Sequence, residues 1–549
     1  MKHNYPYYEV SRINSIQDLL RQGVQEAGDK PVFQYKSRGN EVQTVTYREF
    51  DTETRALAAA IEALVEPNTH IAVIGENSYP WVTVYIAMLR SRNVIVPVDK
   101  ELPLEDIIHV LSHSDSEILF FAKRYRKYME ALSAALPKIR YFIGFEEEAD
   151  EGKILSYQKI LSEGKTKPYQ DVPHDITKMK AIVYTSGTTS LAKGVMLSEE
   201  NLISMVYYGL RVSTIYTKCL SVLPYHHTYE AVAGLLVSMH KHACICINEN
   251  MRMVLTNLQL YKPDYIYVVP AFLELFYKKI WANAAESNKA GLMRVMIVVS
   301  NALRKVGIDV RRKLFHSVHE AFGGNLIKIV TGGAPLRAEL GKFFIDVGFD
   351  LINGYGITEC SPLISANRDA FNDPETVGVP VECLEVRFEN MASDGTGEIC
   401  VKGKTVMLGY YKDEERTREV LRDGWFSTGD YGKMNQRGQL IITGRKKNLI
   451  VLKNGKNIFP EEIEGYIMQS PYVEEVIVRA MQDENGEESG LLAEVFLNQE
   501  AVEGIDDAEA ALRKDISRLL MQLPPYKHIT KIVIRDTAFE KTTTNKIKR

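Results

Sequence analysis

The densest group of side chains suited to binding phosphate lies in the segment Tyr184-Thr-Ser-Gly-Thr-Thr-Ser-Leu-Ala-Lys-Gly194. Its hydroxyls and loop N–H groups can surround phosphate oxygens, and Lys193 adds a positive charge. Because Gly194 and Val195 follow the lysine, the segment does not fit the GxxxxGK[ST] pattern of a P-loop. Ser, Thr and Gly clusters are also typical of polar turns. Composition alone therefore leaves two interpretations, a phosphate-binding loop and a polar turn.

Two more glycine-rich segments each follow a predicted strand, Thr331-Gly-Gly-Ala-Pro335 and Asn353-Gly-Tyr-Gly-Ile-Thr-Glu359. In α/β proteins, ligands bind beyond the carboxyl ends of the strands. The glycines allow close backbone approach, Tyr355 has an aromatic face for stacking, and Glu359 has hard oxygens that suit Mg²⁺. A turn tyrosine and a solvated glutamate are the alternative interpretations.

The elements that must position these segments show an alternating pattern. Residues 70–97 contain a β-branched run, a stretch with apolar residues three and four apart, and a second β-branched run, which predicts a βαβ unit. Such alternation favours an α/β fold with mostly parallel sheets. Further strands are predicted at 118–122, 141–144, 181–184, 244–247, 265–269, 327–330 and 351–352.

After about Gly403 the predicted strands become shorter and are separated by turn signals such as Asp423-Gly424 and Asn454-Gly455. A helix is predicted to begin near Pro460. Strands predicted at 476–479, 491–497 and 531–535 would complete a small α+β unit. We expect the boundary near Gly444.

Composition excludes several classes of protein. The chain has 549 residues, 45% hydrophobic and 25% charged, so it is a multidomain globular protein and not a disordered or fibrous one. A net charge of −4 provides no broad positive field for nucleic acid. The six cysteines lack the spacing of a zinc site or a disulfide framework. We expect a cytoplasmic protein without a leader or a membrane-spanning segment, and peripheral membrane contact stays open.

These segments together resemble the motifs of the adenylate-forming superfamily of AMP-binding enzymes. Their sequences are most similar to those of bacterial long-chain fatty acyl-CoA synthetases. The family's phosphate loop resembles YTSGTTGxPKG, from which this chain differs at Ser190 and Ala192. Ser427-Thr-Gly-Asp430 and Gly444-Arg445 resemble its ribose-binding pair. The segment 444–464 resembles its hinge, and residues 541–549 resemble its closing motif, with Asn545 where glycine is usual.

The resemblance implies a large N-terminal domain, residues 1–444, of stacked and mostly parallel sheets with helices, holding the acid, ATP and Mg²⁺ sites. It implies a hinge at 445–447 and a small mobile α+β domain at 448–549. Catalytic roles are implied for Lys546, Lys193, Thr185 and Glu359. The implied ATP-binding residues are Thr185, Ser186, Gly187, Thr188, Thr189, Lys193, Gly333, Ala334, Pro335, Asn353, Gly354, Tyr355, Gly356, Thr358, Asp430, Arg445 and Lys546.

Further implied roles are Mg²⁺ ligation by Thr185 and Glu359, an acyl pocket at His226, His227, Ala271 and Gly332, a hinge at Lys447 and a coenzyme A path past Gly455. The implied reaction joins a fatty acid to ATP and then to coenzyme A. Amino acids are disfavoured, since the histidine pair stands where amino-acid-activating relatives have Phe-Asp. The alternatives are an acyl carrier protein as acceptor, an aryl or other carboxylic acid as substrate, and a catalytically silent binding protein.

Overall fold

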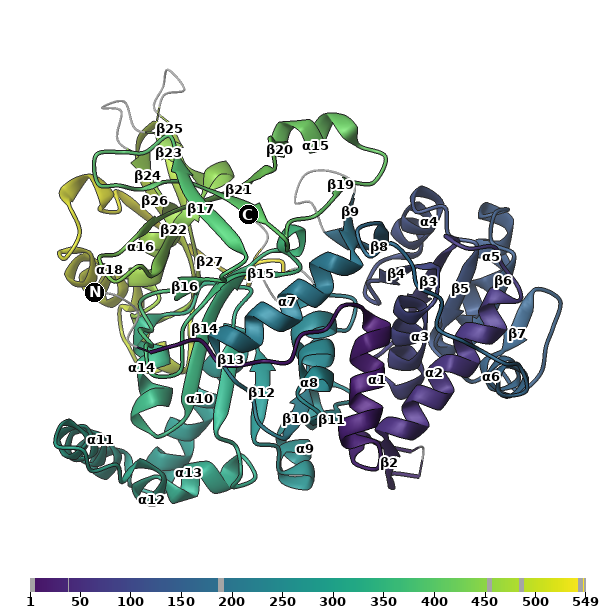
Figure 1. Cartoon of the computed structure of the whole chain (residues 1–549). Helices are drawn as coiled ribbons and strands as arrows, with labels where there is room; N and C mark the ends of the chain where they lie inside the picture. The colour runs from purple at the N-terminus through teal and green to yellow at the C-terminus, as the bar shows by residue number, and fades with distance from the viewer. Residues whose placement is uncertain are drawn as a thin grey trace. The chain divides into compact units, whose positions relative to one another are not determined.

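A computed structural model describes residues 5–37, 39–185, 192–451, 457–482, 488–541 and 547. The chain folds into two compact units, whose helices and strands are labelled in Figure 1. The first comprises Met1–Glu385 and Lys402–Phe426, and the second comprises Val386–Val401 and Ser427–Arg549. The chain passes between the units within β17 (Leu384–Glu389), β18 (Gly397–Gly403) and β21 (Trp425–Met434).

An eight-stranded sheet forms one part of the first unit. Its strands lie in the order β19 (Gly409–Tyr410), β9 (Lys193–Ser198), β8 (Met179–Thr185), β4 (Val94–Val98), β3 (His70–Ile74), β5 (Ile118–Phe121), β6 (Tyr141–Gly144) and β7 (Ile154–Ser156). The β3–α3–β4 unit is parallel, with His70 opposite Val94, and β8 and β9 form an antiparallel hairpin. The buried β-branched runs thus form central parallel strands, as expected.

A nine-stranded sheet forms the other part of the first unit. Its order is β16 (Val379–Pro380), β15 (Leu363–Ala366), β14 (Asp350–Gly356), β13 (Lys328–Thr331), β12 (Tyr265–Val268), β10 (Lys218–Ser221), β11 (Cys244–Ile247), β1 (Pro31–Lys36) and β2 (Val42–Thr46). The strands from β14 to β11 and on to β1 are parallel, and their carboxyl ends therefore lie at one edge.

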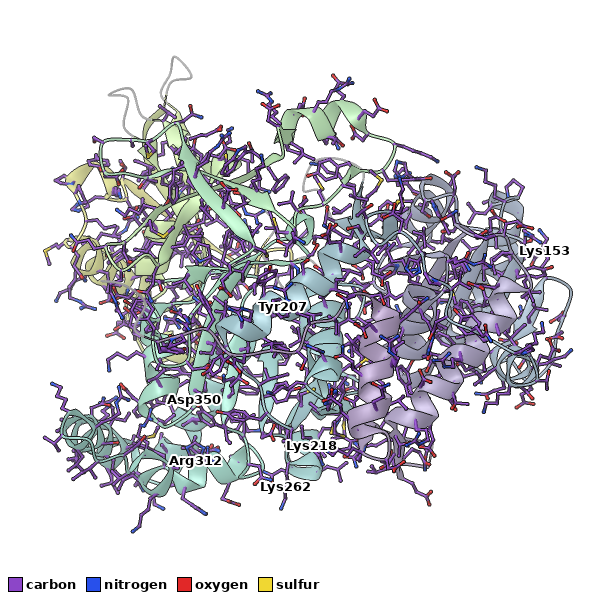
Figure 2. All side chains as sticks on the ribbon, in the orientation of Figure 1. Lys153, Tyr207, Lys218, Lys262, Arg312 and Asp350 are labelled. Carbon is purple, nitrogen blue, oxygen red and sulfur yellow. The ribbon has the colours of Figure 1, made fainter. Side chains whose placement is uncertain are left out.

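Helices connect and cover these strands (Figures 1 and 2). Ser198 and Asn201 form a reciprocal capping box at the start of α7, which explains why the helix begins directly after β9. The α-helices are α1 (Ile16–Ala27), α2 (Tyr47–Glu62), α3 (Tyr79–Arg90), α4 (Leu104–His113), α5 (Met129–Ala135), α6 (Tyr157–Lys165), α7 (Glu199–Val212), α8 (Val237–His240), α9 (Val254–Tyr261), α10 (Pro270–Glu286), α11 (Ala290–Lys305), α12 (Arg311–Leu314), α13 (His316–Ala321), α14 (Ala338–Asp346) and α15 (Glu414–Val420).

Shorter elements complete the first unit. A π-helix, η2 (Tyr229–Leu236), precedes α8, and β20 (Leu421–Arg422) follows α15. The 3-10 helices are η1 (Lys123–Tyr128), η3 (Met251–Met253) and η4 (Thr358–Cys360). Within the described ranges, no helix is long and apolar enough to span a bilayer.

The second unit has its own apolar core. Buried residues of α16 (Pro460–Ile467) and α18 (Ala508–Leu520) pack against a sheet of β25 (Val473–Gln482), β26 (Glu488–Leu497) and β27 (Lys531–Arg535). The remaining elements are β22 (Leu440–Arg445), η5 (Lys446–Asn448), β23 (Ile450–Val451), β24 (Asn457–Ile458), α17 (Gln499–Val502) and η6 (Pro525–Lys527). The predicted α/β class is confirmed, with a large unit of mixed sheets and a smaller α+β unit. The hinge at 445–447 stays a prediction.

Candidate functional site

The β8–β9 hairpin carries the two described ends of the predicted phosphate loop. Thr185 is the last residue of β8, Lys193 is the first of β9, and the two lie directly opposite each other in the antiparallel register. A Cβ at Gly194 would lie 2.9 Å from Ile182 Cγ2, so glycine is needed beside this lysine. The hairpin therefore places the Thr185 hydroxyl group and the Lys193 ammonium group at the same end of the two strands. The predicted ligands Ser186, Gly187, Thr188 and Thr189 lie outside the described residues.

The two glycine-rich segments lie side by side at the carboxyl ends of β13 and β14, where Thr331 is opposite Asn353. A Cβ at Gly332 would lie 2.9 Å from the Gly354 carbonyl oxygen, and one at Gly356 would lie 1.9 Å from the carbonyl oxygen of Pro362. These approaches exclude side chains and leave backbone surface for a flat ligand. The predicted residues Ala334 and Pro335 follow in the same loop.

Tyr410 connects two predicted catalytic residues. Its hydroxyl donates a 2.9 Å hydrogen bond to Glu359 Oε1, and the Lys193 ammonium lies 5.2 Å from the centroid of its ring. Tyr410 lies opposite Val195, because β19 pairs with β9. Burial, and then the Glu359 charge, raise the pKa of the Tyr410 hydroxyl far above its ordinary value, so this hydroxyl remains a donor. Tyr410 therefore orients the carboxylate from a fixed position beside the lysine.

Tyr410→Phe is expected to reduce Mg²⁺-dependent turnover roughly threefold to tenfold, because one hydrogen bond is lost while the ring beside Lys193 remains. The Mg²⁺ concentration that gives half-maximal rate should rise. Titration of Mg²⁺ against initial rate measures both quantities. Tyr411→Phe is the matched control, since it removes a neighbouring 2.9 Å hydrogen bond to Asp115. Equal effects of the two variants would contradict the assigned role of Tyr410.

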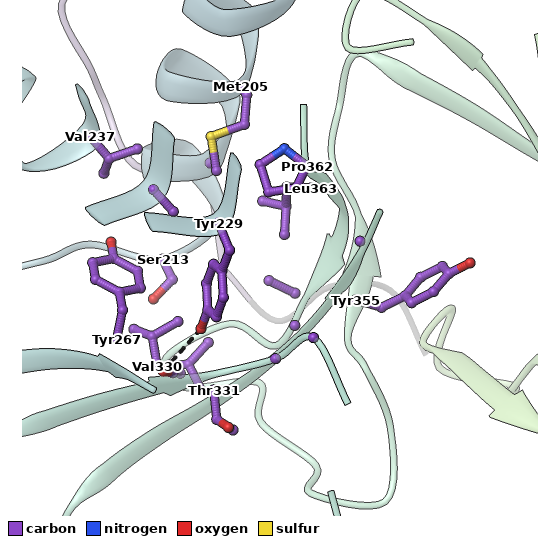
Figure 3. Close-up of a pocket in the computed structure, with 18 of the residues that line it drawn as sticks. Met205, Ser213, Tyr229, Val237, Tyr267, Val330, Thr331, Tyr355, Pro362 and Leu363 are labelled. Carbon is purple, nitrogen blue, oxygen red and sulfur yellow. Dashed lines mark hydrogen bonds between the residues drawn. The ribbon is translucent and has the colours of Figure 1, made fainter. Parts of the chain in front are cut away.

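An apolar cavity of about 100 Å³ lies beside the same strand ends (Figure 3). One water molecule needs roughly 10–15 Å³ on this measure, so the cavity can take an extended group several atoms long. The Tyr229 hydroxyl has one proton to donate, to the carbonyl oxygen of Val330 at 3.1 Å or to that of Val268 at 3.3 Å. Among the described residues that line the cavity, none is charged. Its lining includes Met205, Gly209, Val237, Tyr267, Gly332, Gly333 and Tyr355.

The predicted acyl-pocket residues divide into two groups. Gly332 lines the cavity, whereas His226, His227 and Ala271 are not among its described lining residues. The two imidazole rings lie 4.2 Å apart, and burial lowers the pKa of His226 well below its ordinary value, so His226 is neutral at pH 7. The acyl-pocket role of the histidines stays a prediction. Tyr229, two positions after His227, lines the cavity but was not predicted from the sequence.

Tyr355 lies on the strand that borders the cavity, with its ring directed away from Met205 and Tyr229 in Figure 3. The ring is half-buried. An aromatic face next to the glycine backbone of the same strand is suited to stacking against a planar heterocycle. The structure thus brings Tyr355, Gly332 and the cavity to one edge of the nine-stranded sheet.

Glu230 is a fully buried carboxyl group in the π-helix that supplies Tyr229. The Ser221 hydroxyl donates a 2.5 Å hydrogen bond to Glu230 Oε1. A Cβ at Gly234 would lie 2.6 Å from this carboxyl group, so the glycine leaves room for it. Burial raises the pKa of Glu230 to about 8, and Glu230 is therefore mostly protonated at pH 7. A neutral carboxyl group thus supports the helix beside the cavity.

This pKa predicts the pH dependence of stability. An unfolded glutamate ionises near pH 4.5 but folded Glu230 keeps its proton until about pH 8, so the free energy of unfolding should fall between these values. The slope is about 1.4 kcal/mol per pH unit. Glu230→Gln should lack this fall, and urea unfolding at several pH values measures the difference. Glu286→Gln, on an exposed carboxylate, should behave as the original chain. Identical pH profiles of the original chain and Glu230→Gln would contradict the buried neutral state.

In the second unit, the predicted ribose-binding pair is assembled on adjacent strands. Asp430 of β21 lies opposite Arg445 of β22, and Arg445 Nε lies 3.1 Å from Asp430 Oδ1. Asp430 is 4% exposed, and its N–H donates to the Thr428 hydroxyl at 3.1 Å. The arginine thus holds a largely buried carboxylate in one orientation. Lys447 lies in η5, directly after this pair, while Gly455 and Lys546 lie outside the described residues.

Glu359 is the carboxylate that the first unit offers at the predicted metal position. Across the part of the chain that the structure describes, no three His, Cys, Asp or Glu side chains form a metal-binding group. Glu359, with its position set by Tyr410, provides hard oxygen ligands. Mg²⁺ commonly takes one or two protein carboxylates and completes its shell with water and substrate phosphates. The residues present therefore fit Mg²⁺ brought with a phosphorylated substrate.

Comparison with known proteins identifies the family and the fold of the chain. Residues 20–411 match the family described as AMP-binding enzyme. The chain is 26% identical to fatty acyl-CoA synthetase B of Dictyostelium discoideum over 516 residues, covering 87% of this chain and 76% of that protein. It is 29% identical to long-chain-fatty-acid–CoA ligase FadD15 of Mycobacterium tuberculosis over 461 residues, covering 79% and 75%. A solved anthranilate CoA ligase with bound anthranoyl-AMP matches the fold with a TM-score of 0.79 at 18% identity, covering 99% of this chain and 96% of that one.

Proposed function

The chain belongs to the AMP-binding enzyme family, and we propose that it is an acid–thiol ligase that activates a fatty acid with ATP and transfers the acyl group to coenzyme A. The observation that carries this proposal is the uncharged cavity beside the glycine backbone of β13 and β14. An alkyl chain is stabilised there by removal from water, whereas the amine of an amino acid would lack a counter-charge. The ligase names of the relatives support the same substrate class.

We assign the nucleotide to polar residues of the first unit beside the cavity and to the Asp430–Arg445 pair of the second unit. The adenine base would stack on Tyr355 against the Gly332–Gly333 backbone, and the phosphates would contact Thr185 and Lys193. Asp430 would accept hydrogen bonds from the ribose hydroxyls, and Arg445 would hold its carboxylate in place. The remaining proposed ATP contacts are Ser186, Gly187, Thr188, Thr189, Gly333, Ala334, Pro335, Asn353, Gly354, Gly356, Thr358 and Lys546.

The reaction follows from this assignment. A carboxylate oxygen attacks the α-phosphorus, the bond to the bridging oxygen of the β-phosphate breaks, and pyrophosphate leaves with the electron pair. Lys193 and Lys546 stabilise the negative charge that develops on the phosphoryl oxygens. Bound at Glu359 and Thr185, Mg²⁺ would supply Lewis-acid neutralisation of the phosphates. The sulfur of coenzyme A then attacks the acyl carbon and its thiol proton is released, while the bond between the acyl carbon and the phosphate oxygen breaks and AMP leaves with the electron pair.

We also propose that the second step uses a different position of residues 448–549, reached by rotation at Lys447, with coenzyme A passing Gly455. Such movement would remove Lys546 after adenylation and admit the thiol. A carrier-protein thiol has the same chemistry, so it remains the alternative acceptor. We place the protein in the cytoplasm.

Asp430→Ala is expected to raise the apparent KM for ATP roughly tenfold, because charge-assisted hydrogen bonds to the ribose are lost. Acid preference should not change. Initial rates at varied ATP, repeated with two acids, measure both effects. Glu398→Gln is a matched control in the same unit, since it disrupts the 2.6 Å ion pair with Lys446. A changed acid preference with an unaltered KM for ATP would contradict the ribose assignment.

A panel of carboxylic acids in an ATP–pyrophosphate exchange assay tests the proposed function. We expect exchange with long-chain fatty acids, weak exchange with aryl acids and none with amino acids. Adding coenzyme A or a carrier protein to parallel reactions identifies the acceptor from the thioester formed. Absence of exchange with every acid, in a preparation that binds ATP, would favour the silent binding protein instead.

A further inference from the structure

The outward face of α11 is a continuous aliphatic stripe. Leu292, Val295, Val298, Val299 and Val306 are 47–71% exposed, although large aliphatic side chains are usually covered. Residues 292, 295, 299, 302 and 306 follow helical spacing and extend along one side of the helix and just beyond it. We call the exposed residues Leu292, Val295, Val298, Val299, Ala302 and Val306 the α11 stripe.

The opposite face of α11 explains why the stripe points outward. Met293 and Ser300 are buried, and the helix packs on α10 and α14 of the same unit. Arg304 lies 4.0 Å from Asp346 of α14, and the Arg294 guanidinium lies 5.6 Å from the Trp281 ring of α10. Only one face of α11 packs against the rest of the unit. The other face is also apolar, although packing within the unit does not require it to be. In Figure 1, α11 and α12 lie at the margin of this unit.

The surroundings of the stripe are positively charged. Residues 270–320 contain nine Lys and Arg but only four Asp and Glu, whereas the whole chain carries −4. Some of these cations have structural partners, such as Arg312, labelled in Figure 2, whose guanidinium donates to the Leu326 carbonyl oxygen. Lys289 and Lys305 lie exposed at the two ends of α11, and Lys313 lies exposed in α12. The stripe therefore has an ammonium group at each end.

We propose that the α11 stripe is a docking surface for an anionic lipid bilayer, with α11 lying in the plane of the membrane interface. An exposed aliphatic helix face flanked by lysines can insert its side chains at the acyl boundary, while the ammonium groups contact lipid phosphates. α11 contains no acidic residue, and the lysines at both ends of the stripe match the negative charge of anionic headgroups, so an anionic lipid surface fits this face. This inference does not depend on the proposed function, although a fatty acid dissolved in a bilayer would then lie near the enzyme.

Flotation of the full chain with vesicles tests the proposal. One set of vesicles contains phosphatidylcholine alone, and the other also contains phosphatidylglycerol. We expect the original chain to float with the anionic set and to bind less tightly as salt increases. Val295→Glu with Val298→Glu should weaken binding at least about tenfold, because two charges are placed at the acyl boundary. Lys289→Glu with Lys305→Glu and Lys313→Glu should remove the preference for anionic vesicles.

Val172→Glu with Met251→Glu is the matched control, since these residues are 44% and 59% exposed outside the stripe. It should float like the original chain. Circular dichroism and ATP–pyrophosphate exchange with a water-soluble acid establish that each variant is folded. If the original chain shows no ATP–pyrophosphate exchange, that result counts against the proposed function and not against the membrane proposal. The proposal is overturned if the original chain floats with neither vesicle set, or if the stripe variant floats unchanged. It is also overturned if the original chain is a dimer and the only effect of the stripe variant is to dissociate that dimer. The stripe would then bind a second copy of the chain.

Discussion

Lys546→Ala is expected to lower acid-dependent ATP–pyrophosphate exchange by on the order of 10²–10³-fold, the size of effect seen when one preorganised charge-stabilising group is removed. The reason is that an ammonium group at this position would neutralise charge on both the attacking carboxylate and the phosphorus. Thioester formation from a supplied acyl-adenylate should stay close to the original rate, because that step forms no bond to phosphorus. Single-turnover measurement of each half-reaction separates the two.

Lys548→Ala removes the same charge two positions further along and serves as the control. It should leave both half-reactions nearly unchanged. If Lys546→Ala slows both half-reactions equally, the assignment of this lysine to adenylation alone is wrong, and so is the use of two positions of the smaller domain.

Glu359→Gln is expected to reduce Mg²⁺-dependent ATP use on the order of a hundredfold, because the substitution removes the carboxylate charge but keeps the shape of the side chain. Its amide oxygen can still accept from Tyr410, so the backbone at η4 should remain in place. Rates measured across a Mg²⁺ series should show weaker Mg²⁺ binding, with saturation at a higher Mg²⁺ concentration. Thermal unfolding should differ little from that of the original chain.

Glu375→Gln, on an exposed carboxylate of the same unit, controls for the general loss of one negative charge. Normal activity of Glu359→Gln at every Mg²⁺ concentration would exclude this residue as a metal ligand. Combining Glu359→Gln with Tyr410→Phe should add little further loss, since the tyrosine acts through this carboxylate.

Much of the fold could be predicted because local pattern and tertiary position agree. The apolar runs at 141–144 and 244–247 are strands with those bounds, since buried parallel strands need apolar residues on both faces. The predicted strand at 531–535 also has those bounds, with residues that are exposed or half-buried. Ser198 marks the start of a helix through its side chain. The two glycine-rich segments lie together because parallel strands bring their carboxyl ends to one edge.

Other features depend on long-range pairing that a single sequence does not encode locally. Tyr410 reaches Glu359 and Lys193 only because two residues of β19 pair with β9, more than two hundred positions earlier. The cavity combines side chains from α7, the π-helix, β12 and the β13–β15 region. Tyr229 could have been predicted, because it lies only two positions after the predicted His227. The sequence does not indicate that the α11 stripe is exposed, because its apolar periodicity is the same as that of a buried helix.

The central claim is that a fatty acid carboxylate attacks the α-phosphorus of ATP, and the fate of the carboxylate oxygen tests it most directly. A fatty acid labelled with oxygen-18 in its carboxyl group is converted with ATP, Mg²⁺ and coenzyme A, and the products are analysed by mass spectrometry. The account predicts one labelled oxygen in AMP and none in pyrophosphate. Label in pyrophosphate or phosphate, or thioester formed without label in AMP, would contradict it.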